Sequence, residues 1–483
     1  MTHPSSSSAP ATDPVAPRIL LLVLASYLMI VLDISIIITG LPRIRESLGF
    51  TPAGLSWVHT AYTLTFGGLL MAGARAGDLF GRKPLFIGGL TVFVLASLMV
   101  GLATSPAMLI AGRALQGLGS AVLAPATLAL LSVYFPEGPG RTRALGLYGA
   151  TAGVGASAGM VLGGVLADLL SWRVGFFINA PIGLLLIAGA LRWVPSPRNA
   201  PSTGHAGGRL DWLGALLSTL GMLALVYGLV EAAETGWQTA GSLLPLLAGV
   251  LLLAGFFVQE SRAAQPLLPL RLLADRARSG AYLARMLYLA GVVGFWFYTT
   301  QYLQGVLGMR PLQAGLAFLP ATGVQFVAAM MVSPLTRRFG HERLLAVGVA
   351  VTALGMAWLA GIGPDSGYFS HVALPMMVLG VGQGLSLSPL TVAGVAGVQP
   401  RDAGAASGLV NTAHQLGGSL GLAMLVVVFA ASGHPDAAPA ADLAHRVSTC
   451  LAVSAGLLGL ALVVVLTMVR RPAPDGLLAV PAR

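Results

Sequence analysis

The feature that most constrains this chain is a succession of long apolar stretches, each about 20 residues in length, which as an α-helix is enough to cross a bilayer. None of the stretches alternates apolar and polar residues, so a membrane β-barrel is excluded. The sequence therefore predicts an all-α polytopic membrane protein with fourteen spans. The spans lie at 19–41, 55–74, 84–104, 107–133, 143–167, 174–194, 210–231, 242–259, 279–305, 312–335, 344–363, 370–396, 404–432 and 446–469.

The composition supports a lipid environment. The chain has 483 residues, is 56% hydrophobic and only 9% charged, and has a mean hydropathy of +0.83. Soluble domains carry about 25% charged residues. The 27 Lys and Arg and 17 Asp and Glu residues are too few to cover a soluble protein of this size. The bilayer is therefore an expected partner.

Residue counts exclude several kinds of chemistry. Cys450 is the only cysteine, so the chain forms no internal disulfide and no multi-cysteine metal site. Lys83 is the only lysine and Pro84 follows it, so there is no Gly-Lys-Ser/Thr loop for ATP. We therefore expect no cofactor, no metal, no use of ATP and no enzymatic activity. A membrane enzyme or sensor is the alternative, and it should show clustered ligands or an appended soluble domain.

Basic residues are distributed unevenly along the chain. An even number of spans places both termini on one side, and cytoplasmic termini would put 20 of the 27 bases in cytoplasmic segments. Basic loops remain on the cytoplasmic side. The sequence therefore predicts a multi-pass protein of the cell (cytoplasmic) membrane with both termini inside. Because the bases are scattered over short loops, nucleic acid is not an expected partner.

The predicted spans divide around a central pair, which lies between the two longest cytoplasmic loops. The expected organisation is a disordered cytoplasmic tail, a six-helix bundle, a linker with two extra transmembrane helices, a second six-helix bundle and a second cytoplasmic tail. These parts cover residues 1–18, 19–194, 195–278, 279–470 and 471–483. A basic Phe-Gly turn recurs at Phe80-Gly81 and Phe339-Gly340, as a duplicated six-helix unit would leave it.

Ionisable side chains within the spans are costly in lipid, so they need a partner or a function. Asp33 is the only acid deep in the spans, and Arg113 is the clearest base of the first bundle. An acid held between desolvation, which favours its neutral form, and a guanidinium, which favours the carboxylate, can take up and release a proton. Proton coupling and a static ion pair are both open. We expect Arg285 to extend to the cytoplasmic surface.

Two sets of polar residues are candidates for a substrate cavity, because each set shares approximately one face of a helix. An aromatic and amide surface suits a large, partly apolar ligand, and interhelical hydrogen bonding is the alternative. The candidates are Tyr298, Gln301 and Gln304 in span nine and Asn411, His414 and Gln415 in span thirteen. In span five, Gly155, Gly159 and Gly163 form a smooth ridge for close or sliding helix packing.

Motifs in the order of these spans resemble those of the major facilitator superfamily, and within it the fourteen-helix drug:H⁺ antiporter branch of the EmrB/QacA type. The resemblance covers residues 19–470. The matching segments are Leu32–Pro42, Gly73–Lys83, Arg113–Gly117, Gly153–Gly164, Ser171–Gly183 and Gly404–Gly418. The sequence departs from the family pattern at Ala74, where the loop motif usually begins with Gly, at Leu79, where a basic residue is common, and at Met160, which replaces a helix-kinking proline.

The resemblance implies roles for individual residues. Asp33 and Arg113 would couple transport to protons. A conformational latch on the cytoplasmic side would comprise Asp78, Gly81, Arg82 and Lys83. Helix packing in the antiporter motif would use Gly155, Gly159, Gly163 and Gly164.

The expected function is secondary active export of lipophilic drugs or toxic small molecules in exchange for protons, by alternating access of a major facilitator fold. Since Asp33 is the only deep acid, monocationic or neutral substrates are favoured. A dedicated exporter of a single metabolite, such as an antibiotic or siderophore, shares every motif. A proton-coupled importer is a further alternative.

Overall fold

The computed structural model describes residues 15–135, 139–195, 211–263, 266–268, 270–398, 403–434 and 436–469. These residues are mostly helical and form no β-strand, which confirms the all-α prediction. Twelve of their helices are long and apolar enough to cross a membrane. The remaining two predicted spans, 55–74 and 143–167, also fall on helices, α2 and α5. The total of fourteen spans stays a prediction.

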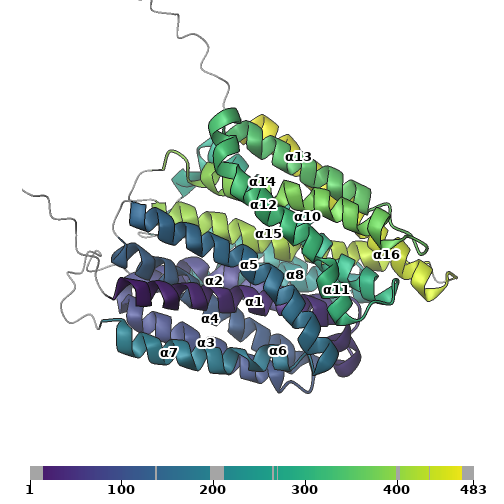
Figure 1. Ribbon diagram of the computed structural model, residues 1–483, viewed down its shortest axis with the longest axis horizontal. Helices are drawn as coiled ribbons and strands as arrows, with labels where there is room; N and C mark the ends of the chain where they lie inside the picture. Colours follow the sequence, from purple (N-terminus) through teal and green to yellow (C-terminus); the bar gives the residue numbers. More distant parts are fainter. Residues whose placement is uncertain are drawn as a thin grey trace, which may run out of the picture.

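The first group of helices forms one side of the molecule in Figure 1. Ser105 illustrates how the sequence sets a boundary, because its hydroxyl accepts the Met108 N–H at 3.3 Å and Pro106 opens the helix that follows. The elements of this group are α1 (Ala16–Leu48), η1 (Gly54–Ser56), α2 (Trp57–Phe80), α3 (Arg82–Gly101), α4 (Pro106–Tyr134), α5 (Pro139–Leu169), α6 (Val174–Phe177) and α7 (Asn179–Trp193).

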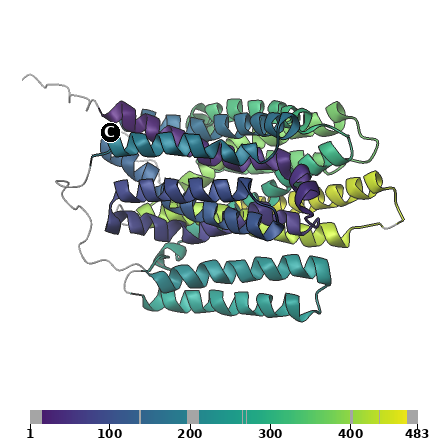
Figure 2. The ribbon, with the colours of Figure 1, turned by 90° about the horizontal axis from the view of Figure 1, so that it is seen from below.

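Two helices, α8 (Trp212–Thr235) and α9 (Ala240–Arg262), pack against each other and form a separate antiparallel layer in Figure 2. Each begins at a polar cap: Asp211 accepts the Gly214 N–H at 2.9 Å, and Thr239 accepts the Ser242 N–H at 3.3 Å. Helix α8 contacts α2 of the first group and α15 (Ala403–Ala431) of the second, so the pair is attached to both groups through α8.

The second group forms the opposite side of Figure 1. Its elements are η2 (Leu270–Leu273), α10 (Arg276–Gly305), α11 (Pro311–Ala317), α12 (Leu319–Phe339), α13 (His341–Leu359), η3 (Tyr368–Ala373), α14 (Leu374–Val395), α15 (Ala403–Ala431), α16 (Pro439–Val464) and η5 (Val465–Val469). The groups meet where α2 packs against α15 and where α5 packs against α11 and α12.

The recurring Phe-Gly turn has the same backbone conformation in both groups. Gly81, between α2 and α3, has φ 90° and ψ 149°, and Gly340, between α12 and α13, has φ 82° and ψ 158°. Side-chain-bearing residues rarely adopt this region. Glycine is therefore required at both turns, which explains why these two positions correspond in the sequence.

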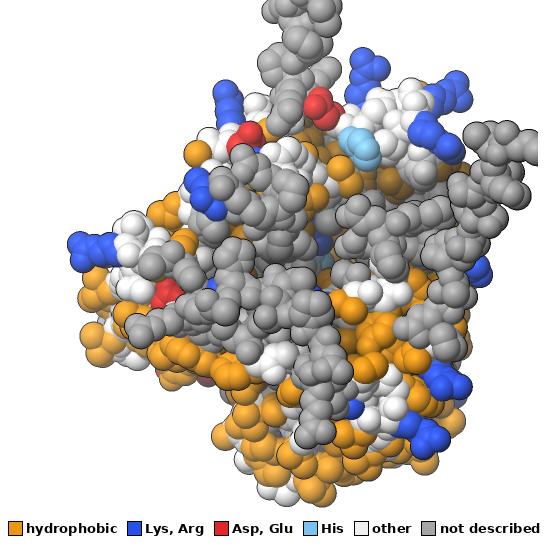
Figure 3. Space-filling model, turned by 90° about the vertical axis from the view of Figure 1, so that its left-hand side faces the viewer, with side chains coloured by type: hydrophobic (Ala, Val, Ile, Leu, Met, Phe, Trp, Pro, Cys, Tyr) orange, Lys and Arg blue, Asp and Glu red, His pale blue; other side chains and the backbone are white. Residues whose placement is uncertain are grey.

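The two ends of the molecule differ in charge. We call the end that holds Arg82, Lys83, Arg337 and Arg338 the basic end, and Figure 3 shows Lys and Arg side chains around its rim. Toward the other end, which we call the opposite end, one apolar core includes side chains of both groups. Leu41 and Trp172 of the first group belong to the same core as Tyr302 and Phe318 of the second. The groups are thus joined by apolar contacts toward the opposite end.

Candidate functional site

Asp33 and Arg113 form a fully buried ion pair. Arg113 Nη1 lies 2.6 Å from Asp33 Oδ2, and the residues are 0% and 1% exposed. Asp33 is the 18th residue of α1, about 25 Å along a helix that rises 1.5 Å per residue. The two candidate residues predicted from different spans therefore lie together in the structure, near the middle of the bundle.

Two amides complete the surroundings of the carboxylate. Gln116 of α4 donates from Nε2 to Asp33 Oδ1 at 3.0 Å, and Asn179 of α7 donates from Nδ2 to the same oxygen at 2.8 Å. Both amides also donate to the Ser97 hydroxyl of α3, at 2.7 and 3.3 Å. We call Asp33, Ser97, Arg113, Gln116 and Asn179 the Asp33 cluster. It joins α1, α3, α4 and α7.

Arg113 is also fixed from the side of α2. Its Nε donates to the Val58 carbonyl at 2.8 Å, and Nη1 donates to Gln116 Oε1 at 2.8 Å. The guanidinium lies over the Tyr62 ring, 4.4 Å from its centroid, in a cation–π contact. Tyr62 in turn donates its hydroxyl to Ser120 at 2.8 Å. Because these partners come from the surrounding helices, the position of Arg113 depends on the packing of the whole first group.

The cluster can act as a proton-sensitive contact. The Asp33 carboxylate accepts three hydrogen bonds, one of them from a cation, so most of its acceptor sites are occupied. A proton on Asp33 would remove the negative charge that Arg113 balances. A buried charge without its partner is costly, so proton uptake would favour rearrangement of the helices around Arg113.

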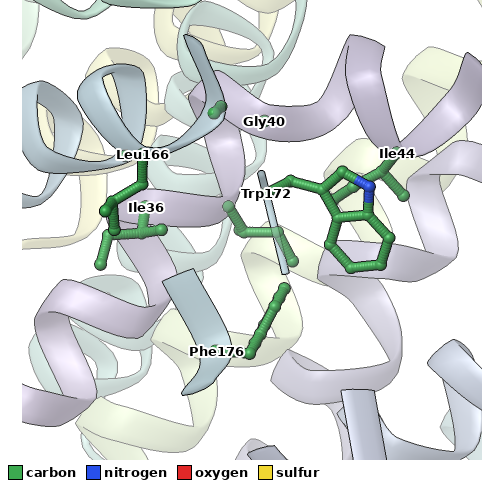
Figure 4. A pocket seen from close by; sticks show the side chains of 9 residues that line it. Ile36, Gly40, Ile44, Leu166, Trp172 and Phe176 are labelled. Atoms are coloured by element: carbon green, nitrogen blue, oxygen red, sulfur yellow. The ribbon is translucent and has the colours of Figure 1, made fainter. Parts of the chain in front are cut away.

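A narrow apolar pocket lies beyond the cluster toward the opposite end (Figure 4). Trp172 is held by a 3.0 Å bond from its Nε1 to the Ser47 hydroxyl, and its ring packs edge-on to Phe176. A pocket without polar groups does not hold ordered water. The space between α1, α5 and α6 on this side of Asp33 is therefore apolar. The residues that line the pocket and are labelled in Figure 4 are Ile36, Gly40, Ile44, Leu166, Trp172 and Phe176.

The glycines of α5 lie on two contact faces. The ridge of Gly155, Gly159 and Gly163 faces α1 within the first group, and a Cβ at Gly163 would lie 2.5 Å from the Ile36 carbonyl oxygen. Gly164 instead faces α11 of the second group, where a Cβ would lie 2.7 Å from the Pro311 oxygen. The ridge thus holds α1, the helix that carries Asp33, while Gly164 belongs to the contact between groups.

The bases of the loop motif bind carbonyl oxygens within the first group. Arg82 Nη1 donates to the Ala129 oxygen at 3.1 Å, and Lys83 Nζ donates to the Leu191 and Val194 oxygens at 3.0 and 2.6 Å. Cations commonly bind the free carbonyls of a helix C-terminus, as Lys83 does at the end of α7. The side chain of Asp78 lies outside the described residues. The latch stays a prediction.

The predicted cavity residues of α10 do not form one wall. Tyr298 is 2% exposed and stacks on Phe429, with ring centroids 5.4 Å apart. Gln301 is buried, whereas Gln304 donates from Nε2 to the Thr39 oxygen of α1 at 3.0 Å. Gln304 therefore bridges the two groups, and Tyr298 packs within the second.

The residues of α15 also face different surroundings. Asn411 is exposed and donates to the Ser407 oxygen of its own helix at 3.2 Å. Gln415 packs against Gly67 of α2, where the two groups meet. His414 Nδ1 lies 3.1 Å from Arg285 Nη2. The expectation that Arg285 extends to the surface is wrong, because this side chain is only 7% exposed and is bound by α14 and α15.

The family follows from comparison with known proteins. A sequence profile described as the Major Facilitator Superfamily matches residues 23–422. This chain belongs to that superfamily. As a major facilitator the protein is a membrane transporter and not an enzyme, and the predicted major facilitator fold is confirmed.

Similar major facilitators include transporters named for antibiotics. The chain is 42% identical to the cephamycin export protein CmcT of Amycolatopsis lactamdurans, over 96% of this chain and 95% of that protein. It is 38% identical to the puromycin resistance protein of Streptomyces alboniger, over 91% and 88% of the two chains. It is 34% identical to the tetracenomycin C resistance and export protein of Streptomyces glaucescens, over 85% and 75%. These similarities support a transporter that exports antibiotics or other drugs.

Solved structures share the fold at low sequence identity. A bacterial homolog of the human lysosomal transporter Spinster, crystallised in an inward-facing and unoccupied conformation, has a TM-score of 0.70 and 16% identity, and the match covers 96% of this chain and 100% of that chain. A mutant of the nucleoside transporter NupG has a TM-score of 0.66 and 13% identity, over 94% and 100%.

Proposed function

We propose that this major facilitator exports lipophilic small molecules, antibiotics among them, in exchange for protons. The observation that carries the proposal is the Asp33 cluster, in which one buried carboxylate and one buried guanidinium hold four helices together. Such a group has two states of different charge. A proton gradient acts on transport only through a group of this kind.

Alternating access follows from where the two groups of helices meet. Apolar contacts join them toward the opposite end, and the pocket on that side of Asp33 is apolar. When the opposite end opens, a proton from that side reaches Asp33, weakens its bond to Arg113 and favours release of the substrate. The proton then leaves toward the basic end after the two groups have closed again.

We further propose cytoplasmic termini in the cell membrane and membership of the fourteen-helix branch. The bases at one end support the orientation. The extra pair α8 and α9, between the two groups in the chain, supports the branch. The sequence-based preference was for monocationic or neutral substrates, and its monocationic part relied on Asp33 as an available acid. In the structure Arg113 neutralises this acid, so the monocationic part loses its support.

A dedicated exporter of a single antibiotic is the second candidate, since the relatives above are each named for one compound. One assay separates the two. Everted vesicles are given a proton gradient and then a panel of ethidium, puromycin and tetracycline. Uptake of several compounds that ceases when nigericin collapses the gradient supports a broad exporter, and uptake of one supports a dedicated exporter. Uptake that is unaffected by nigericin would contradict proton exchange.

A further inference from the structure

Arg285 is a second deeply buried guanidinium, and it differs from Arg113 in having no acid. It is the tenth residue of α10, about 14 Å from the basic end of that helix, and is 7% exposed. Among the described residues, no carboxylate forms an ion pair with it. A charge at this depth is costly without a counter-ion and marks a site of function.

The partners of Arg285 are neutral groups on two other helices. Nη1 donates to the Thr391 hydroxyl at 2.8 Å and lies 3.4 Å from the Leu387 oxygen, both on α14. Nη2 lies 3.1 Å from His414 Nδ1 on α15. The Nε hydrogen is buried and has no partner among the described residues. Arginine offers five donors in a planar fork that suits a carboxylate, so this side chain retains capacity for an anion.

The cluster borders the boundary between the two groups. Gln415, next to His414 on α15, packs against α2 of the first group. Arg285 also lies within electrostatic range of Tyr27 on α1, and Tyr27 stacks on Tyr148 of α5 with ring centroids 3.9 Å apart. Thr391 is exposed, so the cluster adjoins an accessible surface. A cationic group and two aromatic rings thus come from opposite groups at the interface that rearranges during transport.

We propose that Arg285, with Thr391 and His414, binds a carboxylate on the transported molecule, and that Tyr27 and Tyr148 face its aromatic or apolar part. The inference rests on the proposed function and assigns its substrate class: amphipathic organic anions or zwitterions. A charge-assisted bond from a buried guanidinium to a carboxylate is strong and geometrically specific. The bound anion would supply the counter-ion that the protein itself does not place beside Arg285.

The test measures binding to the purified full-length protein in nanodiscs without any gradient. The probes are N-dansyl-leucine, a fluorescent lipophilic carboxylate, and its methyl ester, which keeps the shape and removes the charge. The variants are Arg285→Gln and Arg285→Lys. Arg276→Gln is the matched control, because it removes an exposed cation at the start of the same helix.

The acid is expected to bind about tenfold tighter than the ester, the 1.4 kcal/mol scale of one charge-assisted bond. Arg285→Gln should abolish this difference by weakening the acid alone, Arg285→Lys should keep part of it, and Arg276→Gln should keep all of it. Equal binding of acid and ester, no binding of the acid, or a preference that survives Arg285→Gln would each overturn the proposal. Proton-driven export is measured separately in vesicles, so its failure is distinguishable.

Discussion

Arg113 Nη1 lies 2.6 Å from Asp33 Oδ2, and neither side chain is accessible. Arg285, which is nearly as buried, has no carboxylate partner among the described residues. One half of the transporter therefore contains a neutralised buried charge and the other an unneutralised one. In the functions proposed above, proton exchange uses the ion pair and substrate recognition uses the single cation.

The ion pair predicts a specific pattern of stabilities. Arg113→Gln removes one partner and leaves the Asp33 carboxyl buried, which costs about 3–5 kcal/mol when a buried pair is broken in this way. The double variant Asp33→Asn with Arg113→Gln leaves no charge and should be more stable than Arg113→Gln alone. Unfolding midpoints in detergent measure the stability of the double variant and of each single variant. If the double variant lost as much stability as the two single variants together, the two residues would not be energetically coupled.

The donors of Gln116 are predicted to be essential. Gln116→Glu keeps the shape but removes the Nε2 bonds to Asp33 and Ser97 and adds a second carboxylate beside Asp33. Loss of a buried bond to a charged group costs about 1–3 kcal/mol, so gradient-driven uptake should fall about tenfold or more.

Gln259→Glu is the matched control for Gln116→Glu. Gln259 likewise donates to an aspartate, to Asp211 Oδ1 at 3.1 Å, but this bond lies in the α8–α9 pair outside the cluster. Uptake should be nearly unchanged in the control. Equal losses in the two variants would show that an added carboxylate is harmful anywhere in the protein, and the special role of Gln116 would be refuted.

The glycine ridge predicts a packing requirement between α1 and α5. Gly163→Ala places a Cβ 2.5 Å from the Ile36 oxygen, and overpacking of this kind costs about 1–3 kcal/mol. Gly456→Ala in α16 meets no atom within 4 Å and should be tolerated. Thermal unfolding in detergent compares them. Equal unfolding midpoints would mean that α1 and α5 accommodate the added methyl group without loss of stability, which would contradict the packing requirement.

The contact between α5 and α11 predicts a conformational effect. At Gly315 a Cβ would lie 2.5 Å from the Met160 oxygen, so Gly315→Val should hold the two groups apart at the opposite end. Gly323→Val, which meets open space on α12, is the control. With Cys450→Ser and Leu312→Cys as background, an impermeant maleimide applied to the opposite end should label Cys at position 312 severalfold faster in Gly315→Val. Labelling at the control rate would contradict the assignment of this contact as a closing surface.

Much of the fold was predictable because a span is a local property of about 20 consecutive residues. The correspondence of Gly81 and Gly340 could also be recognised in the sequence, because a turn with positive φ requires glycine at both positions. Of the groups that bind Asp33, Arg113 was predicted from the sequence, but the two amides and the serine that binds them were not. Gln116 and Asn179 lie 83 and 146 positions from Asp33 in the chain, and Asn179 lies 82 positions from Ser97, so only packed helices bring these residues together.

Two further expectations depend on helix geometry, and the cavity role of the α10 residues stays a prediction. Tyr298, Gln301 and Gln304 are spaced by three, but each step of three residues turns the side chain by about 60° from the previous one. Tyr298 and Gln304 therefore reach different neighbours. Arg285 was expected at the surface because it is near the start of a span. Its orientation toward α14 and α15 instead depends on the rotation of α10, which periodicity did not reveal.

The most direct test of the central claim is proton movement through Asp33. Purified protein is reconstituted into liposomes that contain the pH indicator pyranine, and a compound exported in the vesicle assay is added on one side. In the wild type, protons are expected to move opposite to the compound. In Asp33→Asn no proton movement is expected, although that variant still binds the compound. Proton movement of wild-type size in Asp33→Asn would contradict proton exchange through Asp33.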